Sequence, residues 1–343
     1  MNNTMNTMNT WKISGTAVQG LRHISDNTPC QDKIFSLRKN SITAIALADG
    51  AGSAALSHYG AETAVKTVCE KLCSEFNLMI NNPDASVVKR NILDAIILQL
   101  NVLAQKLKCE ISDLSSTLLA AASDDKSLMI VHLGDGIIAC SSRGEMKAVS
   151  LPDNGEYKNE TFFTTSHDAL SRMRLLKGST SGISGIALMS DGTEDSFFDR
   201  NKNKFSDLLE EIKQKTVMYP EEDTDRELEY IFDGIVKQTT RDDCSLIIMS
   251  RPDEFFRGYR DLDEDDQYDF LAVSTTEKKA YREKIFRILA GQESVTRSKI
   301  IETAQALGLK RRQVTGLLRT LCNEGFIQKT SILSKRYRLN FYF

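Results

Sequence analysis

The pattern of hydrophobic and polar residues changes several times along the chain. Residues 11–20, 33–37 and 42–48 alternate or run together in the way that predicts short strands. Residues 57–78 and about 85–108 carry apolar side chains at helical spacing, with Ala61, Ala64, Val65, Val68 and Leu72 on one side of the first stretch. The first third of the chain therefore predicts strands followed by two long amphipathic helices.

The pattern returns to strands after Ser116. Residues 116–123, 127–136, 137–142 and 145–150 predict four short strands of an antiparallel meander. Residues 152–182 are polar and weakly patterned, which is typical of a mobile surface insertion. Residues 186–189 and 244–249 predict two further buried strands, with helices between about 203 and 239. The first 250 residues thus predict one α+β domain.

Composition sets the broad class of protein. The chain has 343 residues, 41% of them hydrophobic, which is enough for about two globular domains. Apolar stretches are too short to span a membrane, and the polar start does not resemble a signal peptide. The seven cysteines are scattered, as is typical of reduced cysteines. We expect a cytoplasmic protein that makes no membrane contact and begins with a disordered leader over residues 1–10.

Charge is distributed unevenly. Residues 277–343 carry 15 Lys and Arg against 5 Asp and Glu, whereas the rest of the chain carries 29 against 42. Residues 253–276 contain a dense acidic run, which predicts a solvated linker or, alternatively, a segment that folds against the basic tail. The expected organisation is a domain over residues 11–252, an acidic linker over 253–276 and a basic domain over 277–343. A basic domain attracts nucleic acid or another anionic partner.

Four aspartates follow apolar runs. Asp49, Asp135 and Asp191 each precede glycine at the end of a predicted strand, and Asp242 precedes the last strand. A single Asp-Gly pair is most often an ordinary turn. Four carboxylates at strand ends are instead what divalent cations with oxygen ligands require.

These motifs, in this order, resemble those of the metal-dependent protein phosphatases of type 2C, in particular the bacterial branch. The resemblance extends from about Gly15 to Ser250 and rests on seven short motifs: Pro29-Cys30-Gln31-Asp32, Ala48-Asp49-Gly50-Ala51-Gly52-Ser53, Gly60-Ala61-Glu62, Ser116-Thr117-Leu118, Leu133-Gly134-Asp135, Ser190-Asp191-Gly192 and Asp242-Asp243-Cys244-Ser245. It implies a four-layer α/β/β/α sandwich of two antiparallel sheets with metal ions at one edge.

The resemblance also implies a set of metal ligands. Asp49 corresponds to the carboxylate that bridges two Mn2+ or Mg2+ ions, and the Gly50 carbonyl to a ligand of one of them. Asp191 and Asp242 would complete the shell of the other ion, while Asp135 and Asp195 match a third, weaker site. Gln31 and Asp32 lie in the first motif, where many members have Glu in place of Gln31, so one ion is expected to be held more weakly.

In this family two metal ions activate a bridging water that attacks phosphorus directly, so no cysteine nucleophile is needed. Arg22 is the nearest candidate for gripping the phosphate, and His23 either shares that role or is a polar loop residue with a structural role. Ala51 stands where eukaryotic members carry a proposed general-acid histidine.

The basic tail predicts three helices and a hairpin, which resembles a winged helix-turn-helix. Its third helix and wing carry exposed polar and basic side chains suited to nucleic acid or to protein contact: Lys310, Arg311, Arg312, Gln313, Arg319, Lys335, Arg336 and Arg338. Both partners remain open at this point.

The sequence thus predicts an α+β protein with a small winged-helix domain that acts as a metal-dependent serine/threonine phosphatase. The winged helix would serve targeting or regulation, and the partners would be phosphorylated proteins and a cognate Ser/Thr kinase. The alternative is a DNA-binding regulator whose phosphatase-like domain is a degenerate sensor.

Overall fold

The computed structural model describes residues 11–153, 161–254, 256, 258–290, 292, 294–330 and 335–340. The leader predicted over residues 1–10 lies outside this range. Among the described residues, no helix combines the length and the apolar character that crossing a membrane requires.

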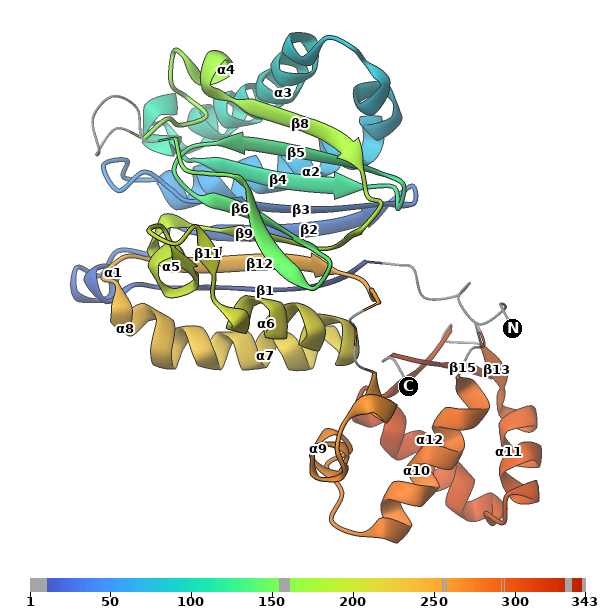
Figure 1. The fold of residues 1–343 in the computed structure, drawn as a ribbon. Helices are drawn as coiled ribbons and strands as arrows, with labels where there is room; N and C mark the ends of the chain where they lie inside the picture. The colour runs from blue at the N-terminus through green and yellow to red at the C-terminus, as the bar shows by residue number, and fades with distance from the viewer. Residues whose placement is uncertain are drawn as a thin grey trace.

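Two antiparallel sheets of five strands face each other (Figure 1). The first has the order β2-β3-β4-β5-β8, formed by β2 (Lys33–Lys39), β3 (Ile42–Ala48), β4 (Leu118–Ser123), β5 (Ser127–Leu133) and β8 (Arg174–Ser179). The second has the order β1-β12-β9-β6-β7, formed by β1 (Lys12–Val18), β12 (Cys244–Ser250), β9 (Ile183–Met189), β6 (Ile137–Ser142) and β7 (Glu145–Ser150).

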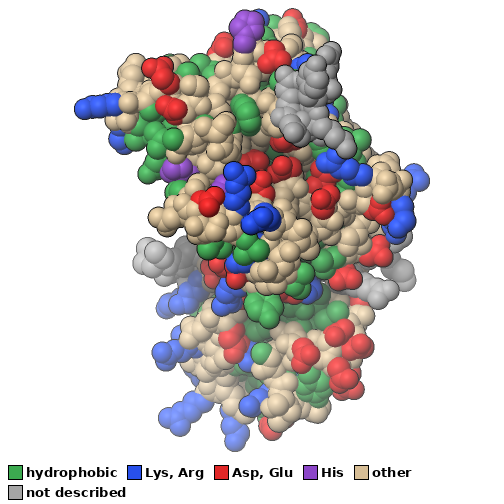
Figure 2. Space-filling view, turned by 90° about the vertical axis from the view of Figure 1, so that its left-hand side faces the viewer, with side chains coloured by type: hydrophobic (Ala, Val, Ile, Leu, Met, Phe, Trp, Pro, Cys, Tyr) green, Lys and Arg blue, Asp and Glu red, His purple; other side chains and the backbone are tan. Residues whose placement is uncertain are grey.

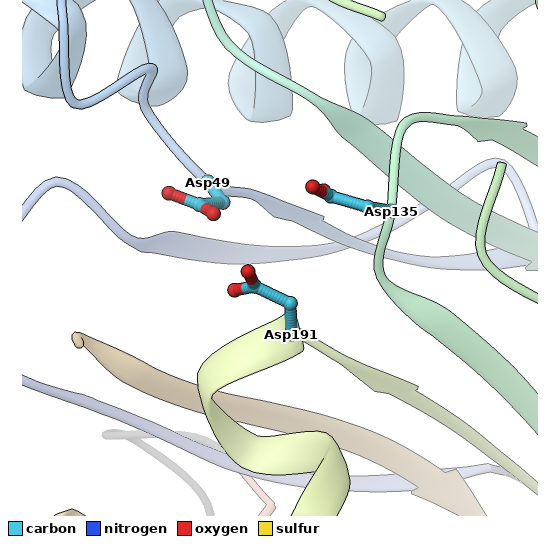
Figure 3. A group of neighbouring side chains, drawn as sticks. All are labelled: Asp49, Asp135 and Asp191. Atoms are coloured by element: carbon cyan, nitrogen blue, oxygen red, sulfur yellow. The ribbon is translucent and has the colours of Figure 1, made fainter. Parts of the chain in front are cut away.

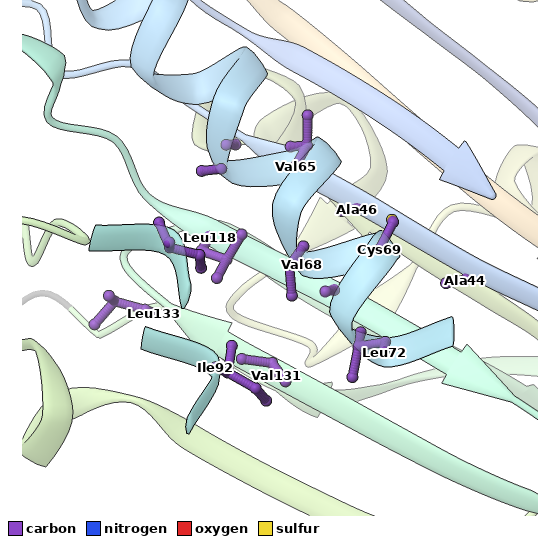
Figure 4. Close-up of a cluster of buried hydrophobic side chains, with 14 of the residues drawn as sticks. Ala44, Ala46, Val65, Val68, Cys69, Leu72, Ile92, Leu118, Val131 and Leu133 are labelled. Carbon is purple, nitrogen blue, oxygen red and sulfur yellow. The ribbon is translucent and has the colours of Figure 1, made fainter. Parts of the chain in front are cut away.

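Helices cover the outer face of each sheet (Figure 1). The first sheet carries α2 (Ser57–Asn81) and α3 (Ala85–Leu107), and the second carries α6 (Asp207–Met218) and α7 (Glu221–Ile231). Figure 4 shows Val68 and Leu72 of α2 packed with Ile92 of α3 over the strands. Burying one such leucine stabilises the fold by about 2 kcal/mol.

The space between the sheets is filled by apolar side chains from both of them. Ile45 and Leu119 from the first sheet pack with Leu188 and Ile247 from the second, and Trp11 closes one end. Central strands are consequently covered on both faces, and all six residues of β4 are buried. This explains why β4 is a continuous apolar run rather than an alternating one.

Short elements connect these layers. They are α1 (Leu21–Ser25), the 3-10 turn η1 (Ile111–Leu114), α4 (Ala169–Arg172), α5 (Asp191–Phe197), β10 (Phe198–Asp199), β11 (Lys204–Phe205), the π-helical turn η2 (Phe232–Val236) and α8 (Lys237–Thr239).

Two expectations for the middle of the chain differ from the structure. The predicted four-strand meander is divided, because β4 and β5 belong to the first sheet whereas β6 and β7 belong to the second. The chain crosses between sheets at the turn that holds Asp135. The segment expected to be a mobile insertion over 152–182 contains β8, which pairs with β5 along its length, while residues 154–160 lie outside the described range.

The described residues from Thr276 onward, called here the C-terminal part, form three helices and a small sheet of order β13-β15-β14. Its elements are α10 (Thr276–Leu289), β13 (Val295–Thr296), α11 (Arg297–Ala306), α12 (Arg311–Asn323), β14 (Ile327–Lys329) and β15 (Arg336–Leu339). Phe286, Ile300, Val314 and Leu318 belong to one apolar cluster, which also includes Met218 at the end of α6. The helices and the β14–β15 hairpin follow the pattern expected from the sequence.

The acidic segment before α10 is folded rather than a solvated linker. It contains the 3-10 turn η3 (Tyr259–Asp261) and α9 (Glu264–Phe270), and Tyr259 and Phe270 are buried in the C-terminal core. The ring of Phe270 lies 5.6 Å from that of Phe326 and 4.8 Å from that of Tyr219 at the end of α6. Tyr259 and Phe270 of the acidic segment thus pack with apolar side chains of the C-terminal part.

A partly buried lysine links the two parts of the molecule. Lys12 Nζ donates hydrogen bonds to the carbonyl oxygens of Tyr219, at 3.0 Å, and Asn340, at 2.6 Å. Burial is the largest cause that lowers the pKa of Lys12 to about 8. The C-terminal part is thus held against β1 and the end of α6, where β12 leaves the sheet.

Candidate metal centre

Three carboxylates converge at one edge of the sheet pair. Asp49 follows β3, Asp135 lies in the turn from β5 to β6, and Asp191 begins α5 directly after β9. One carboxylate oxygen from each lies within 4.8 Å of the other two, and Figure 3 shows the side chains pointing toward a common space. Three elements that are distant in sequence thus build one acidic site. Figure 2 shows Asp and Glu side chains gathered on one face of the upper half of the molecule.

Glycines set the position of Asp135. Gly134 has a φ of +113°, which L side chains rarely adopt, and a Cβ at this position would lie 2.6 Å from the side chain of Thr117. A Cβ on Gly136 would lie 2.6 Å from the carbonyl oxygen of Met189. The Asp135 carboxylate in turn accepts a 2.5 Å hydrogen bond from Thr161 Oγ1. The Gly-Asp-Gly sequence therefore allows the tight crossing between sheets.

Thr117 fixes the backbone of Asp49 from both sides. The Asp49 amide donates to Thr117 Oγ1 at 2.9 Å, and the Thr117 amide donates to the Asp49 carbonyl at 2.8 Å. Gly50 follows where the first turn of α2 packs closely, since a Cβ there would lie 2.8 Å from the side chain of Ser57. These contacts leave the Asp49 side chain directed into the site.

Asp32 lies beneath the site with an incomplete set of partners. Asp32 is 1% exposed, and its Oδ2 accepts a 2.6 Å hydrogen bond from Ser245 Oγ. Its other oxygen, Oδ1, is buried without a hydrogen-bond partner among the described residues. A buried carboxylate oxygen without a donor is costly unless a cation or a proton satisfies it.

The carboxylates raise one another's pKa. Burial is the largest cause for Asp49, followed by the charges of Asp32 and Asp191, and its pKa lies well above the usual value. Burial followed by the charge of Asp135 raises the pKa of Asp191 to about 7, although part of this residue faces solvent. Oxygen ligands, shared negative charge and the unpartnered oxygen of Asp32 are together what a divalent cation would neutralise, so the residues fit a metal site.

This repulsion predicts a pH-dependent stability. In EDTA, Asp191→Asn is expected to raise the melting temperature relative to the unsubstituted protein at pH 7.5. The pKa of Asp191 is higher in the folded than in the unfolded protein, so its negative charge destabilises the fold fully above about pH 7. This destabilisation decreases as the pH falls and is lost below the ordinary pKa near 4. Thermal unfolding of both proteins between pH 4.5 and 8 should show the gain shrinking as pH falls; a gain independent of pH would contradict the electrostatic origin.

The two adjacent aspartates before β12 occupy different environments. Asp242 is exposed and lies outside the group of three, but its charge contributes to raising the pKa of Asp49 and Asp191. Asp243 is 2% exposed and accepts hydrogen bonds from the backbone amides of Gly20, at 2.7 Å, and Gln31, at 2.5 Å. Sequence analysis did not select Asp243, although its position directly before a buried strand is a signal for an inward side chain.

The two residues expected to bind phosphate, Arg22 and His23, also occupy different environments. Arg22, on α1, has an exposed side chain, and its amide donates to the carbonyl of Arg241 beside Asp242. His23 is buried, and its Nδ1 lies 2.9 Å from Asp243 Oδ2. Arg22 therefore faces solvent, where its guanidinium lies 3.9 Å from the Asp26 carboxylate, whereas His23 is buried against Asp243.

The other candidate ligands lie near the same edge. Gln31 is buried, and its carbonyl accepts a 3.3 Å hydrogen bond from the Gly50 amide. Asp195 is exposed one turn after Asp191 on α5 and is not part of the group of three. Burial, with the charges of Asp243 and Asp32, raises the pKa of the Cys30 thiol, so this cysteine stays protonated and is a poor nucleophile.

Comparison with known proteins gives consistent matches. Residues 19–231 match the sequence model of a family described as Protein phosphatase 2C. Serine/threonine-protein phosphatase 3 of Escherichia coli (strain K12) is 28% identical over 192 residues, which cover 54% of this chain and 74% of that protein.

Comparison with solved structures gives further matches. A sex-determining protein of C. elegans superposes with a TM-score of 0.51 at 18% identity, covering 71% of this chain and 65% of that one. A serine/threonine phosphatase of Staphylococcus aureus gives a TM-score of 0.47 at 17% identity, covering 74% of this chain and 100% of that one. The family model ends before α8, so residues 277–343 lie outside it.

Proposed function

The chain belongs to the protein phosphatase 2C family and is a serine/threonine phosphatase, and from this premise we propose that it hydrolyses phosphoserine and phosphothreonine in proteins with Mn2+ or Mg2+ held at the edge of its two sheets. The observation that carries the proposal is the convergence of Asp49, Asp135 and Asp191 from three separate elements. The arrangement of two facing sheets between helices supports the four-layer sandwich expected for such a site.

In this assignment Asp49 would bind two ions, with the Gly50 carbonyl as a ligand of one of them. Asp191 and Asp242 would complete one shell, and Asp135 and Asp195 would serve a third, weaker ion. Asp32, whose Oδ1 has no hydrogen-bond partner in the described part of the chain, would face the bound metal directly or through water. When bound, such ions lower the pKa of a water molecule and neutralise phosphoryl oxygens.

The chain's own residues orient the substrate and hold the ligands. The Arg22 amide bonds to Arg241 beside Asp242, and its exposed guanidinium, now near Asp26, would bind the oxygens of the incoming phosphate. His23 would act as a positioning residue through Asp243, which binds the backbone of both Gly20 and Gln31.

We propose that residues 277–343 form a winged helix that targets or regulates the phosphatase. The order helix, strand, two helices and two strands supports this assignment, as does the sheet order β13-β15-β14. This part packs where β12 ends at Ser250, and the metal edge lies at the other end of β12, about 20 Å away for a seven-residue strand. Such a position favours targeting over blockage of the site.

The function is tested by removing and restoring the metal. Protein stripped with EDTA is expected to lose hydrolysis of p-nitrophenyl phosphate by roughly 100-fold or more, and added Mn2+ or Mg2+ should restore it. With metal, phosphoserine and phosphothreonine peptides should be hydrolysed faster than a matched phosphotyrosine peptide. Turnover that survives chelation, or a preference for phosphotyrosine, would contradict the proposal.

A further inference from the structure

We propose that the C-terminal part binds duplex DNA, with α12 in the major groove and the β14–β15 hairpin on the phosphates. The contact surface, called here the basic surface, is formed by α12, the start of α11 and the hairpin. Six of its side chains carry the argument: Arg297, Arg311, Arg312, Arg319, Lys335 and Arg338.

The outer face of α12 is polar and basic throughout. Val314, Leu318 and Leu321 are buried, and the positions opposite them on the helix are Arg312, Gly316, Arg319 and Asn323, all exposed. A Cβ on Gly316 would meet no atom within 4 Å, so the helix surface is open there. Two arginines thus flank a point where the backbone can approach the floor of a groove.

The three elements form one continuous surface. Arg297, at the start of α11, donates from Nη2 to Thr315 Oγ1 of α12 at 3.5 Å. The amide of the same arginine donates to the Lys335 carbonyl at 2.6 Å. The helix face and the hairpin are therefore joined through Arg297, as a ligand that contacts both would require.

The six named positive charges on this surface have no ion-pair partner among the described residues. No described carboxylate lies within ion-pair distance of Arg311, Arg312 or Arg319, nor of Lys335 or Arg338. Acidic residues of this part have other partners; Glu324, for example, pairs with Arg282. In Figure 2 the Lys and Arg side chains of the lower half gather along one side and the Asp and Glu side chains on the other. The basic surface is thus available to an external polyanion.

The side-chain chemistry favours DNA over a protein partner. Protein interfaces usually have an apolar or aromatic centre, whereas the outer face of α12 has none. Among the described residues after 276, Leu307 is the one large apolar side chain that is exposed. Arginine and asparagine are side chains that read guanine and adenine edges, and an α-helix fits the major groove of DNA but not that of A-form RNA.

The test uses the full-length protein in EDTA, so that the metal site cannot hold the phosphates. Binding of a fluorescein-labelled 20-base-pair DNA duplex is followed by fluorescence anisotropy between 50 and 200 mM salt. Arg312→Ala with Arg319→Ala is compared with a control of equal charge change on α3, Arg90→Ala with Lys106→Ala; thermal unfolding confirms that each protein is folded.

We expect the α12 variant to bind DNA at least about tenfold more weakly, and its dependence of log K on log salt to be less steep by roughly 1 to 2. The α3 control should bind like the unsubstituted protein. The proposal is overturned by absence of binding at 50 mM salt, by equal loss in both variants, by equally tight binding of duplex RNA, or by displacement of DNA by polyglutamate at equal charge concentration. The last outcome would assign the surface to an acidic protein.

Discussion

Replacing Asp49 by asparagine is expected to reduce kcat for p-nitrophenyl phosphate about 1000-fold or more while leaving the protein folded. Asparagine keeps the shape of the side chain but removes the charge at the centre of the acidic site. Metal ions contribute several kcal/mol of charge stabilisation to such reactions, and each 1.4 kcal/mol is a tenfold change in rate. The measurement is the initial rate at saturating Mn2+.

A second readout separates a lost ligand from a damaged fold. Because neighbouring charges and burial raise the pKa of Asp49, the Asp49→Asn protein should melt at a higher temperature than the unsubstituted protein in EDTA and gain less stability from added Mn2+. Asp94→Asn, on the exposed side of α3, makes the same chemical change far from the site and should alter neither rate nor stability. Full activity in Asp49→Asn would remove the metal assignment.

The carboxylates were predictable because each follows an apolar run. Asp49 and Asp191 both end buried strands, β3 and β9, and a chain emerging from a buried sheet must expose its next polar residue at the edge. What the sequence did not reveal is which strands share a sheet. The turn at Asp135 carries the chain from β5 in one sheet to β6 in the other, and only long-range pairing with β4 and β9 decides this.

Local composition was a poorer guide where aromatic residues lie among acidic ones. The run around Asp263 and Asp265 is typical of a solvated linker. Tyr259 and Phe270 on either side of it are nevertheless buried, because Phe326 and Tyr219, from remote parts of the chain, supply apolar contacts. A charge pattern describes the outer face of a short helix and says little about its inner face.

The adjacent aspartates before β12 give the most direct test of how the site is held together. Asp243→Ala is expected to lower the free energy of unfolding in urea by about 3 kcal/mol or more, because it leaves two backbone amides without their acceptor and removes the charge that His23 faces. Its activity should fall as well, since Gln31 and the start of α1 lose their common anchor.

Asp242→Ala is the matched control, one residue away and exposed. This variant should unfold at nearly the same urea concentration as the unsubstituted protein in EDTA and should need more Mn2+ for half-maximal activity. A stable Asp243→Ala protein would show that the amides of Gly20 and Gln31 find other acceptors. An unfolded Asp242→Ala protein would show that Asp242 supports the fold rather than binding metal. A loss of stability in Asp243→Ala and a higher Mn2+ requirement in Asp242→Ala would show that the start of β12 supplies both a metal ligand and the support of the site.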